Sequence, residues 1–177
     1  MPLTALVLAG TRAGGDPLAT LAGVTHKALI EVGGRTMIER VVGALAALPQ
    51  VGRIVVAIER PELLDGLPGL QPSACAKPLV TMAPEAGPSA TLAVALAREG
   101  VPLLVTTADH ALLQTGWVEE FLAACPAGAD VAPARPGAGR RAGHATHMAA
   151  LRGRRLLGLQ SVPDGAACRR RRRGAVA

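Results

Sequence analysis

Four short apolar runs divide the first two thirds of the chain, at residues 4–9, 53–58, 79–82 and 102–107. Turn-forming residues bound each run. Uninterrupted apolar runs of this length are typical of strands that are buried on both faces, as in a parallel sheet. The pattern therefore predicts four strands of such a sheet.

Between these runs, apolar residues recur at helical spacing over residues 36–48, 89–98 and 115–124. Thr36 and Glu39 have the spacing of a capping box, in which each side chain accepts the other residue's backbone N–H at a helix start. Alternating strands and helices predict an α/β fold with three αβα layers around a Rossmann-like, mostly parallel sheet. In such folds the loops at the carboxyl ends of the strands form the site.

The pattern disappears after residue 130, which divides the chain into a domain at 1–130 and an Arg/Gly/Ala/Pro-rich tail at 131–177. The whole chain carries a net charge of +6, but the domain is at −4 and the tail at +10. One interpretation of the tail is a disordered basic extension, and another is a non-specific nucleic-acid-binding segment. Because the tail lacks aromatic residues for base stacking, we expect no specific nucleic-acid recognition.

A third hypothesis is that the tail is an out-of-frame translation of the natural end of the domain. The codons of Met148 and Ala149, read one nucleotide later, necessarily contain a Trp codon, and residues 154–163 can also regain aromatic residues in that frame. The nucleotide sequence of the gene tests this hypothesis, because stop codons in the neighbouring frame would contradict it.

Composition narrows the class of protein further. The 3 cysteines are far apart and form no CxxC pair, so neither a disulfide framework nor a zinc site is indicated. No apolar stretch approaches the roughly 20 residues of a membrane span, and the N-terminal residues lack the basic region of a secretory signal. We therefore expect a cytoplasmic protein with no membrane partner; the sequence indicates no oligomeric state.

The first apolar run ends at Gly10, and Arg12 and Lys27 follow it. Backbone N–H groups at a strand end that stops in glycine can face an anion, and the two cations could offset the charge of a triphosphate. The segment is not a Walker A loop, because Asp16 and Pro17 stand where that motif needs Lys and Ser or Thr, and no GxGxxG is present. The alternative is an ordinary strand-to-helix connection with surface cations.

Asp109 follows the fourth apolar run, where a carboxylate would lie at the carboxyl edge of the sheet. Mg²⁺ is typically held by one or two carboxylates together with substrate phosphates. The alternative is a helix-capping or turn residue. Gly87 and Ser89 begin the third predicted helix, with Ser89 as its N-cap residue; the same residues could also contact a nucleobase or ribose.

Taken in order, these segments resemble the MobA-type nucleotidyltransferases, which have the nucleotide-diphospho-sugar transferase fold. Residues 8–12 (LAGTR) are similar to the LAG(G)xxxR signature of the family, Lys27 to its signature lysine, residues 87–89 to its base-contacting segment and Asp109 to its magnesium aspartate. Thr11 stands where the family usually has a second glycine. The loop also lacks the Arg-Met-Gly core of the molybdenum-cofactor enzymes, which speaks against a molybdopterin acceptor.

The resemblance implies transfer of a nucleoside monophosphate from a nucleoside triphosphate to a phosphorylated small-molecule acceptor, with Mg²⁺ as cofactor and release of pyrophosphate. The alternatives are an inactive nucleotide-binding relic and, in another class, a nucleic-acid binder that acts through residues 169–173. The implied catalytic residues are Arg12, Lys27 and Asp109, with Asp109 as the metal ligand. The implied nucleotide-binding residues are Leu8, Ala9, Gly10, Thr11, Arg12, Lys27, Gly87 and Ser89.

Overall fold

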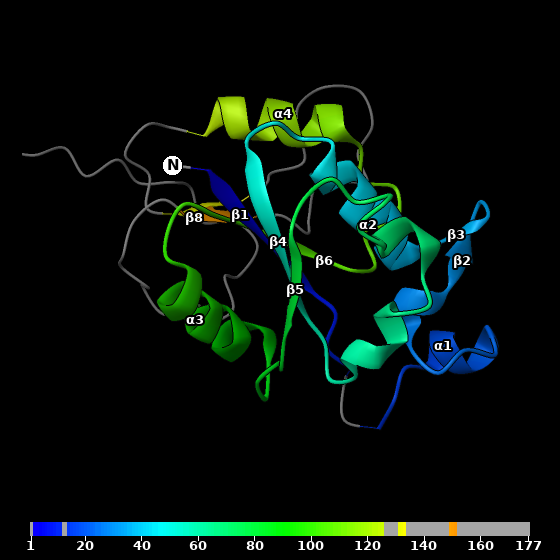
Figure 1. Ribbon diagram of the computed structural model, residues 1–177. Coiled ribbons are helices and arrows are strands. Elements are labelled where there is room, and N and C mark those ends of the chain that lie inside the picture. The colour runs from blue at the N-terminus through cyan, green and yellow to red at the C-terminus, as the bar shows by residue number, and fades with distance from the viewer. Residues whose placement is uncertain (1, 12–13, 126–130, 134–148, 152–177) are drawn as a thin grey trace, which may run out of the picture.

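The computed structural model describes residues 2–11, 14–125, 131–133 and 149–151 of the 177. Its centre is a six-stranded sheet with the order β5-β4-β1-β6-β8-β7 (Figure 1). The first four strands in that order are parallel to one another. Strand β8 pairs antiparallel with β6 and with β7. The sheet strands are β1 (Leu3–Leu8), β4 (Val51–Ala57), β5 (Leu79–Met82), β6 (Leu103–Thr107), β7 (Val131–Pro133) and β8 (Ala149–Leu151).

The predicted α/β fold is confirmed. The four parallel strands match the predicted apolar runs to within one or two residues at each end. The helices α2 (Met37–Ala46), α3 (Pro88–Glu99) and α4 (Thr115–Ala124) match the three predicted helices closely. The smaller elements are α1 (Pro17–Leu21), the 3₁₀ helices η1 (Lys27–Leu29), η2 (Pro61–Leu64) and η3 (Pro68–Leu70), and the hairpin of β2 (Glu31–Val32) and β3 (Arg35–Thr36).

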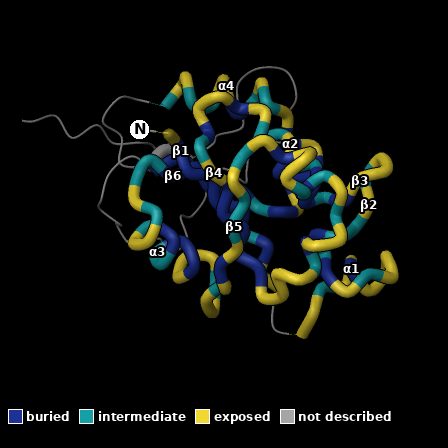
Figure 2. The backbone as a smooth tube through the Cα atoms, viewed as in Figure 1, coloured by how far each residue is buried: buried dark blue, intermediate teal, exposed yellow. Residues whose placement is uncertain are grey.

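Helices cover both faces of the sheet, as a three-layer arrangement requires. Val41, Val42 and Leu45 of α2 and Val118 of α4 pack with sheet residues in one core cluster. Leu92 and Ala95 of α3 pack with Leu6 and Val55 in a second cluster, and Figure 1 shows α2 and α3 on opposite sides of the sheet. The central strands are buried, whereas α1 is largely exposed (Figure 2). Burial from both sides explains why the parallel strands are mostly apolar. Arg53 of β4 and Thr81 of β5 are exposed exceptions.

The predicted capping box is present at the start of α2. Thr36 Oγ1 accepts the Glu39 N–H at 3.3 Å, and Glu39 Oε2 accepts the Thr36 N–H at 3.0 Å. The other Glu39 oxygen accepts the Gly69 N–H of η3 at 2.8 Å. Glu39 is buried. Its hydrogen bond with Gly69 links the start of α2 to a loop that is distant in the sequence.

The prediction that Ser89 is the N-cap residue of the third helix is wrong. Gly87 is the N-cap residue and Pro88 is the first residue of α3, so Ser89 lies within the first turn. Proline suits the first helical position because its missing N–H has no partner there in any case.

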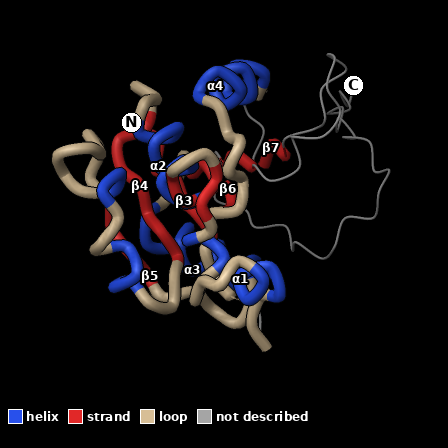
Figure 3. Tube along the Cα trace, turned by 90° about the vertical axis from the view of Figure 1, so that its right-hand side faces the viewer, coloured by secondary structure: helices blue, strands red, loops and turns tan. Residues whose placement is uncertain are grey.

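Strands β7 and β8 were not predicted and come from the region after residue 130. They extend the sheet beyond β6 (Figure 3). Residues 134–148 and 152–177, which include residues 169–173, lie outside the described residues. In the part of the chain that the structure describes, no helix is long and apolar enough to cross a membrane.

Candidate functional site

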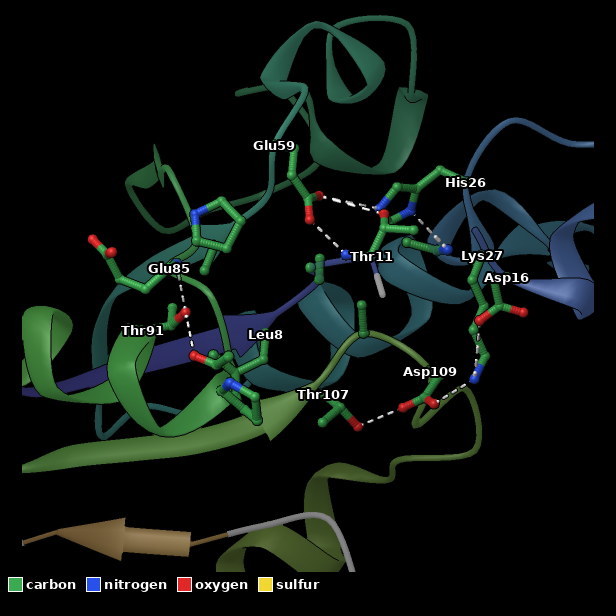
Figure 4. A pocket seen from close by; sticks show the side chains of 18 of the residues that line it. Leu8, Thr11, Asp16, His26, Lys27, Glu59, Glu85, Thr91, Thr107 and Asp109 are labelled. Carbon is green, nitrogen blue, oxygen red and sulfur yellow. Dashed lines mark hydrogen bonds and ion pairs between the residues drawn. The ribbon is translucent and has the colours of Figure 1, made fainter. Parts of the chain in front are cut away.

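The carboxyl ends of the parallel strands border a cleft of about 690 Å³ (Figure 4). Its walls come from the ends of β1 and β6, from the segments that follow β4 and β5, and from α1 and η1. This is the predicted position of a site in an open parallel sheet. The residues with polar side chains that line it are Thr11, Asp16, His26, Lys27, Glu59, Glu85, Thr91, Thr107 and Asp109.

Lys27 and Asp109 meet at one end of the cleft although they are 82 residues apart in the sequence. Lys27 Nζ lies 2.8 Å from Asp109 Oδ2 and 3.9 Å from Asp16 Oδ2. Thr107 Oγ1 donates a hydrogen bond of 2.5 Å to the other Asp109 oxygen. The Lys27 side chain is 33% exposed, so it is open to the cleft while carboxylates hold it in place. The fold thus brings together the two residues that the sequence singled out for phosphate and metal.

The Gly10 turn lies between β1 and the end of β4. A Cβ atom on Gly10 would lie 3.4 Å from Glu59 Oε1 and 3.4 Å from Pro84 Cβ, at van der Waals contact with both. Leu8, Ala9, Gly10 and Thr11 all line the cleft. The structure therefore places four of the predicted nucleotide-binding residues at the cleft wall, while Arg12 lies outside the described residues.

The opposite wall begins at Glu85 and continues into α3. Gly87 lines the cleft, but Ser89 is exposed and is not among the lining residues. Buried Thr91 takes the position next to the loop: its Oγ1 accepts the Glu85 N–H at 2.8 Å and donates to the Gly87 carbonyl at 3.0 Å. Thr91 thereby fixes the loop between β5 and α3.

His26 and Glu59 are cleft residues that the sequence analysis did not single out. His26 is buried, and its Nδ1 accepts the Ala28 N–H at 3.1 Å. Its Nε2 lies 3.8 Å from Glu59 Oε2, while Glu59 Oε1 accepts the Thr11 N–H at 2.6 Å. Glu59 could have been found from the sequence, because it directly follows the second apolar run as Asp109 nearly follows the fourth. Nothing in the sequence marks the burial of His26.

The donor set suits Mg²⁺ only in part. Among the described residues no group of three or more His, Cys, Asp or Glu side chains could hold a metal ion. Mg²⁺ commonly needs fewer protein ligands, because it keeps several waters and uses substrate phosphates for the rest. Asp109 at the rim, with Lys27 beside it to offset phosphate charge, fits that pattern.

The fold is that of an α/β protein with a cleft at the carboxyl edge of its sheet. The sequence matches the model of the MobA-like NTP transferase domain over residues 5–173, so the chain belongs to that family. The match runs past residue 130 into the region that contains β7 and β8. No curated protein matches the chain.

Solved structures are similar to the chain. A hypothetical transferase from Thermus thermophilus is 31% identical with a TM-score of 0.57, covering 74% of this chain and 49% of that one. A CMP:2-keto-3-deoxy-manno-octonic acid synthetase complexed with CTP is 14% identical with a TM-score of 0.52, covering 70% of this chain and 46% of the other. The 4-diphosphocytidyl-2C-methyl-D-erythritol synthase from Anaerococcus prevotii is 12% identical with a TM-score of 0.52, at coverages of 70% and 50%.

The last two likenesses show the fold alone. The chain spans about half the length of these three structures.

Proposed function

We propose that this chain is a nucleotidyltransferase that moves a nucleoside monophosphate from a nucleoside triphosphate to the phosphate of a small-molecule acceptor. The observation that carries the proposal is the pairing of Lys27 with Asp109 at 2.8 Å beside the Gly10 turn. A cation, a carboxylate and backbone N–H groups at one strand edge are the groups that nucleotide phosphates and their metal need. Membership of the MobA-like NTP transferase family supports the same function.

In the proposed reaction an oxygen of the acceptor phosphate forms a bond to the α-phosphorus of the triphosphate. The bond from that phosphorus to the oxygen bridging to the β-phosphorus breaks, and pyrophosphate leaves with the electron pair. The protein supplies position and charge rather than a covalent intermediate. Lys27 would offset charge on the α-phosphate and on the leaving group, and the Gly10 loop would orient the phosphate oxygens.

Asp109 would hold Mg²⁺, which supplies positive charge to the phosphate oxygens when it is bound. The 3.9 Å contact between Lys27 and Asp16 gives the lysine a second carboxylate on the far side. We infer that these two carboxylates keep Lys27 directed into the cleft before the nucleotide arrives. The loop that Thr91 fixes, with Gly87 at its end, would then meet the base or ribose.

The test combines binding with turnover. Thermal unfolding with ATP, GTP, CTP and UTP, each with Mg²⁺ or with a chelator, identifies the donor, because a ligand at 100 times its dissociation constant stabilises by about 2.7 kcal/mol. Pyrophosphate release is then measured for that nucleotide with a panel of sugar phosphates as acceptors. A magnesium-dependent shift followed by pyrophosphate release supports the proposal.

A shift without release for any acceptor would indicate the nucleotide-binding relic instead. No shift with any nucleotide, in a protein that unfolds cooperatively, would contradict both interpretations.

A further inference from the structure

We propose that Glu59 is an intramolecular competitor for nucleotide phosphates at the Gly10 turn. Its carboxylate occupies the Thr11 N–H in this structure and transfers to His26 Nε2 when a phosphate takes that N–H. The identity of the physiological ligand rests on the proposed function. The competition itself is a property of the cleft.

The first observation is the contact between Glu59 and Thr11. Glu59 Oε1 accepts the Thr11 N–H at 2.6 Å, which is short for an N–H···O bond. Thr11 Oγ1 lies 3.5 Å from the second Glu59 oxygen. The Thr11 N–H directly follows Gly10, at the strand end where backbone donors face an anion. Glu59 therefore holds a donor that a bound phosphate would use.

A phosphate oxygen and the Glu59 carboxylate cannot share this position. Both are negatively charged acceptors, and like charges in contact repel strongly where water is partly excluded. A ligand that binds at the turn must first displace the carboxylate. Such an opposing charge discriminates against ligands that have few other contacts to offset it.

The second observation is the unpartnered nitrogen of His26. A backbone N–H can only donate, so His26 Nδ1 must accept from Ala28, and the neutral ring carries its proton on Nε2. His26 is 5% exposed, and among the described residues its Nε2 has no hydrogen-bond partner. A buried donor without an acceptor is costly, so this atom favours any acceptor that moves within reach.

Glu59 is the acceptor in position to do so. Its Oε2 lies 3.8 Å from His26 Nε2, just outside hydrogen-bond distance, and Figure 4 shows Glu59 directed toward both Thr11 and His26. A small side-chain rotation would exchange the Thr11 bond for a bond to His26. The Thr11 N–H is available to a ligand only when the Glu59 carboxylate is bonded to His26. A phosphate that binds the Thr11 N–H therefore favours the position of Glu59 at His26.

The competition should affect small inorganic anions most, because they lack the base and ribose through which a nucleotide could make further contacts. The experiment therefore uses inorganic triphosphate, which has no base, ribose or transferable nucleotide, titrated calorimetrically into the full chain. Glu59→Gln removes the charge and Glu59→Ala removes the acceptor. Both variants are expected to bind triphosphate roughly tenfold more tightly than the parent, since a charge-assisted hydrogen bond no longer has to be broken.

Glu62→Gln is the matched control, because Glu62 is exposed, lies three residues further along the chain and does not line the cleft. It makes the same change in net charge and is expected to leave triphosphate affinity unchanged. Unchanged or weaker binding in both Glu59 variants would overturn the proposal. An equal gain in Glu62→Gln would do so too, because the effect would then be one of overall charge.

A double-mutant cycle tests the receiving role of His26. His26→Asn keeps an oxygen that can accept the Ala28 N–H in a turn of the same kind, and it removes the Nε2 donor. The substitution is expected to weaken triphosphate binding several-fold in the parent and to have no effect in the Glu59→Ala background. Additive effects would remove His26 from the proposal.

The outcome is separable from the proposed function. Triphosphate binding can tighten in the Glu59 variants even if the chain releases no pyrophosphate, and pyrophosphate release can be observed even if the variants bind triphosphate as the parent does.

Discussion

Glu39 and Glu59 each accept a backbone N–H from a loop, yet one glutamate is buried beneath η3 and the other lies in the cleft. Glu39 is 7% exposed and accepts hydrogen bonds from Thr36 and Gly69 through both oxygens. The Glu59 side chain is 40% exposed and has a second donor, His26, within 3.8 Å. The buried Glu39 carboxylate therefore keeps one set of hydrogen-bond partners. The exposed Glu59 carboxylate has a second donor nearby and can exchange one partner for the other.

Other charged residues of the cleft are, like Glu59, partly exposed. Lys27 contacts two carboxylates and remains one-third exposed, so its ammonium group is positioned by them and is still accessible from the cleft. Exposed ion pairs contribute little to stability, in general about 0–1 kcal/mol. Residues of the cleft should therefore matter for turnover and hardly for folding, and Glu39 should show the reverse.

The largest expected effect is that of Lys27→Ala. If Lys27 stabilises the transferring phosphate as proposed, removing its charge should lower the rate of pyrophosphate release by roughly 10²–10³-fold. The melting temperature should stay close to that of the parent, because the pair with Asp109 is partly exposed. Lys77→Ala, which removes a lysine outside the cleft, is the control for net charge. A turnover within a few-fold of the parent would remove Lys27 from the mechanism.

Asp109→Asn should change the magnesium requirement. The amide keeps the size of the side chain but is a much weaker ligand for a hard cation than a carboxylate. The magnesium concentration for half-maximal turnover should rise by at least about tenfold, since even indirect partners of metal ligands have effects of that size. An unchanged magnesium titration would indicate that Asp109 only closes a turn and positions Lys27.

Glu39→Ala should have the opposite effect: it should lower the stability of the fold and leave the cleft, which Glu39 does not line, unchanged. It removes the Glu39 half of the capping box and leaves the Gly69 N–H, the Thr36 N–H and the Thr36 hydroxyl without this acceptor, at a combined cost of about 3 kcal/mol. Urea unfolding measures the loss, and Glu31→Ala, at an exposed glutamate of the nearby β2 strand, is the control. Nucleotide affinity of the folded variant should match that of the parent. A loss below about 1 kcal/mol would contradict the structural role.

The smallest effect concerns acid stability. Burial raises the pKa of Glu39, but hydrogen bonds from Gly69 and Thr36 and the nearby Arg35 charge outweigh it and hold the pKa below its usual 4.5. A lowered pKa stabilises the fold fully above the unfolded value and ceases to do so as the pH falls through the folded value. The stability gap between the parent and Glu39→Gln should therefore shrink below about pH 4.5. A gap that stays constant into acid would show that the charge of Glu39 is not involved.

The parallel strands could be predicted from the sequence because burial makes most of their residues apolar. Strands β7 and β8 could not, since each has three residues and together they contain mostly alanine and proline. Such segments acquire strand structure from the neighbours they pair with rather than from their own pattern. The boundary at residue 130 thus marks where the apolar pattern stops, whereas the sheet continues beyond it.

For the site, position along the strands was the informative signal. Asp109 and the Gly10 turn follow apolar runs, and parallel topology brings such ends together. Lys27 was singled out as a cation that follows the Gly10 segment, and its resemblance to a signature lysine supported that choice. The pairing of Glu59 with Thr11 and the burial of His26 depend on packing between distant segments. Thr91 was missed because Pro88 shifts the start of α3 to Gly87, which moves the inward-facing hydroxyl two residues beyond Ser89.

The sheet order also constrains the sequence of events during synthesis. Strand β6 carries the residues that lead into Asp109, and its outer neighbour is β8, which begins only at Ala149. Until the intervening residues have been added, β8 is not yet synthesised, so a parallel block that forms at that stage would have β6 at its outer edge. Its backbone N–H and C=O groups on that side then have no strand partner, and open edges of this kind can pair with other chains. The strand that leads into Asp109 would thus be open to pairing with other chains until the last described strand has emerged.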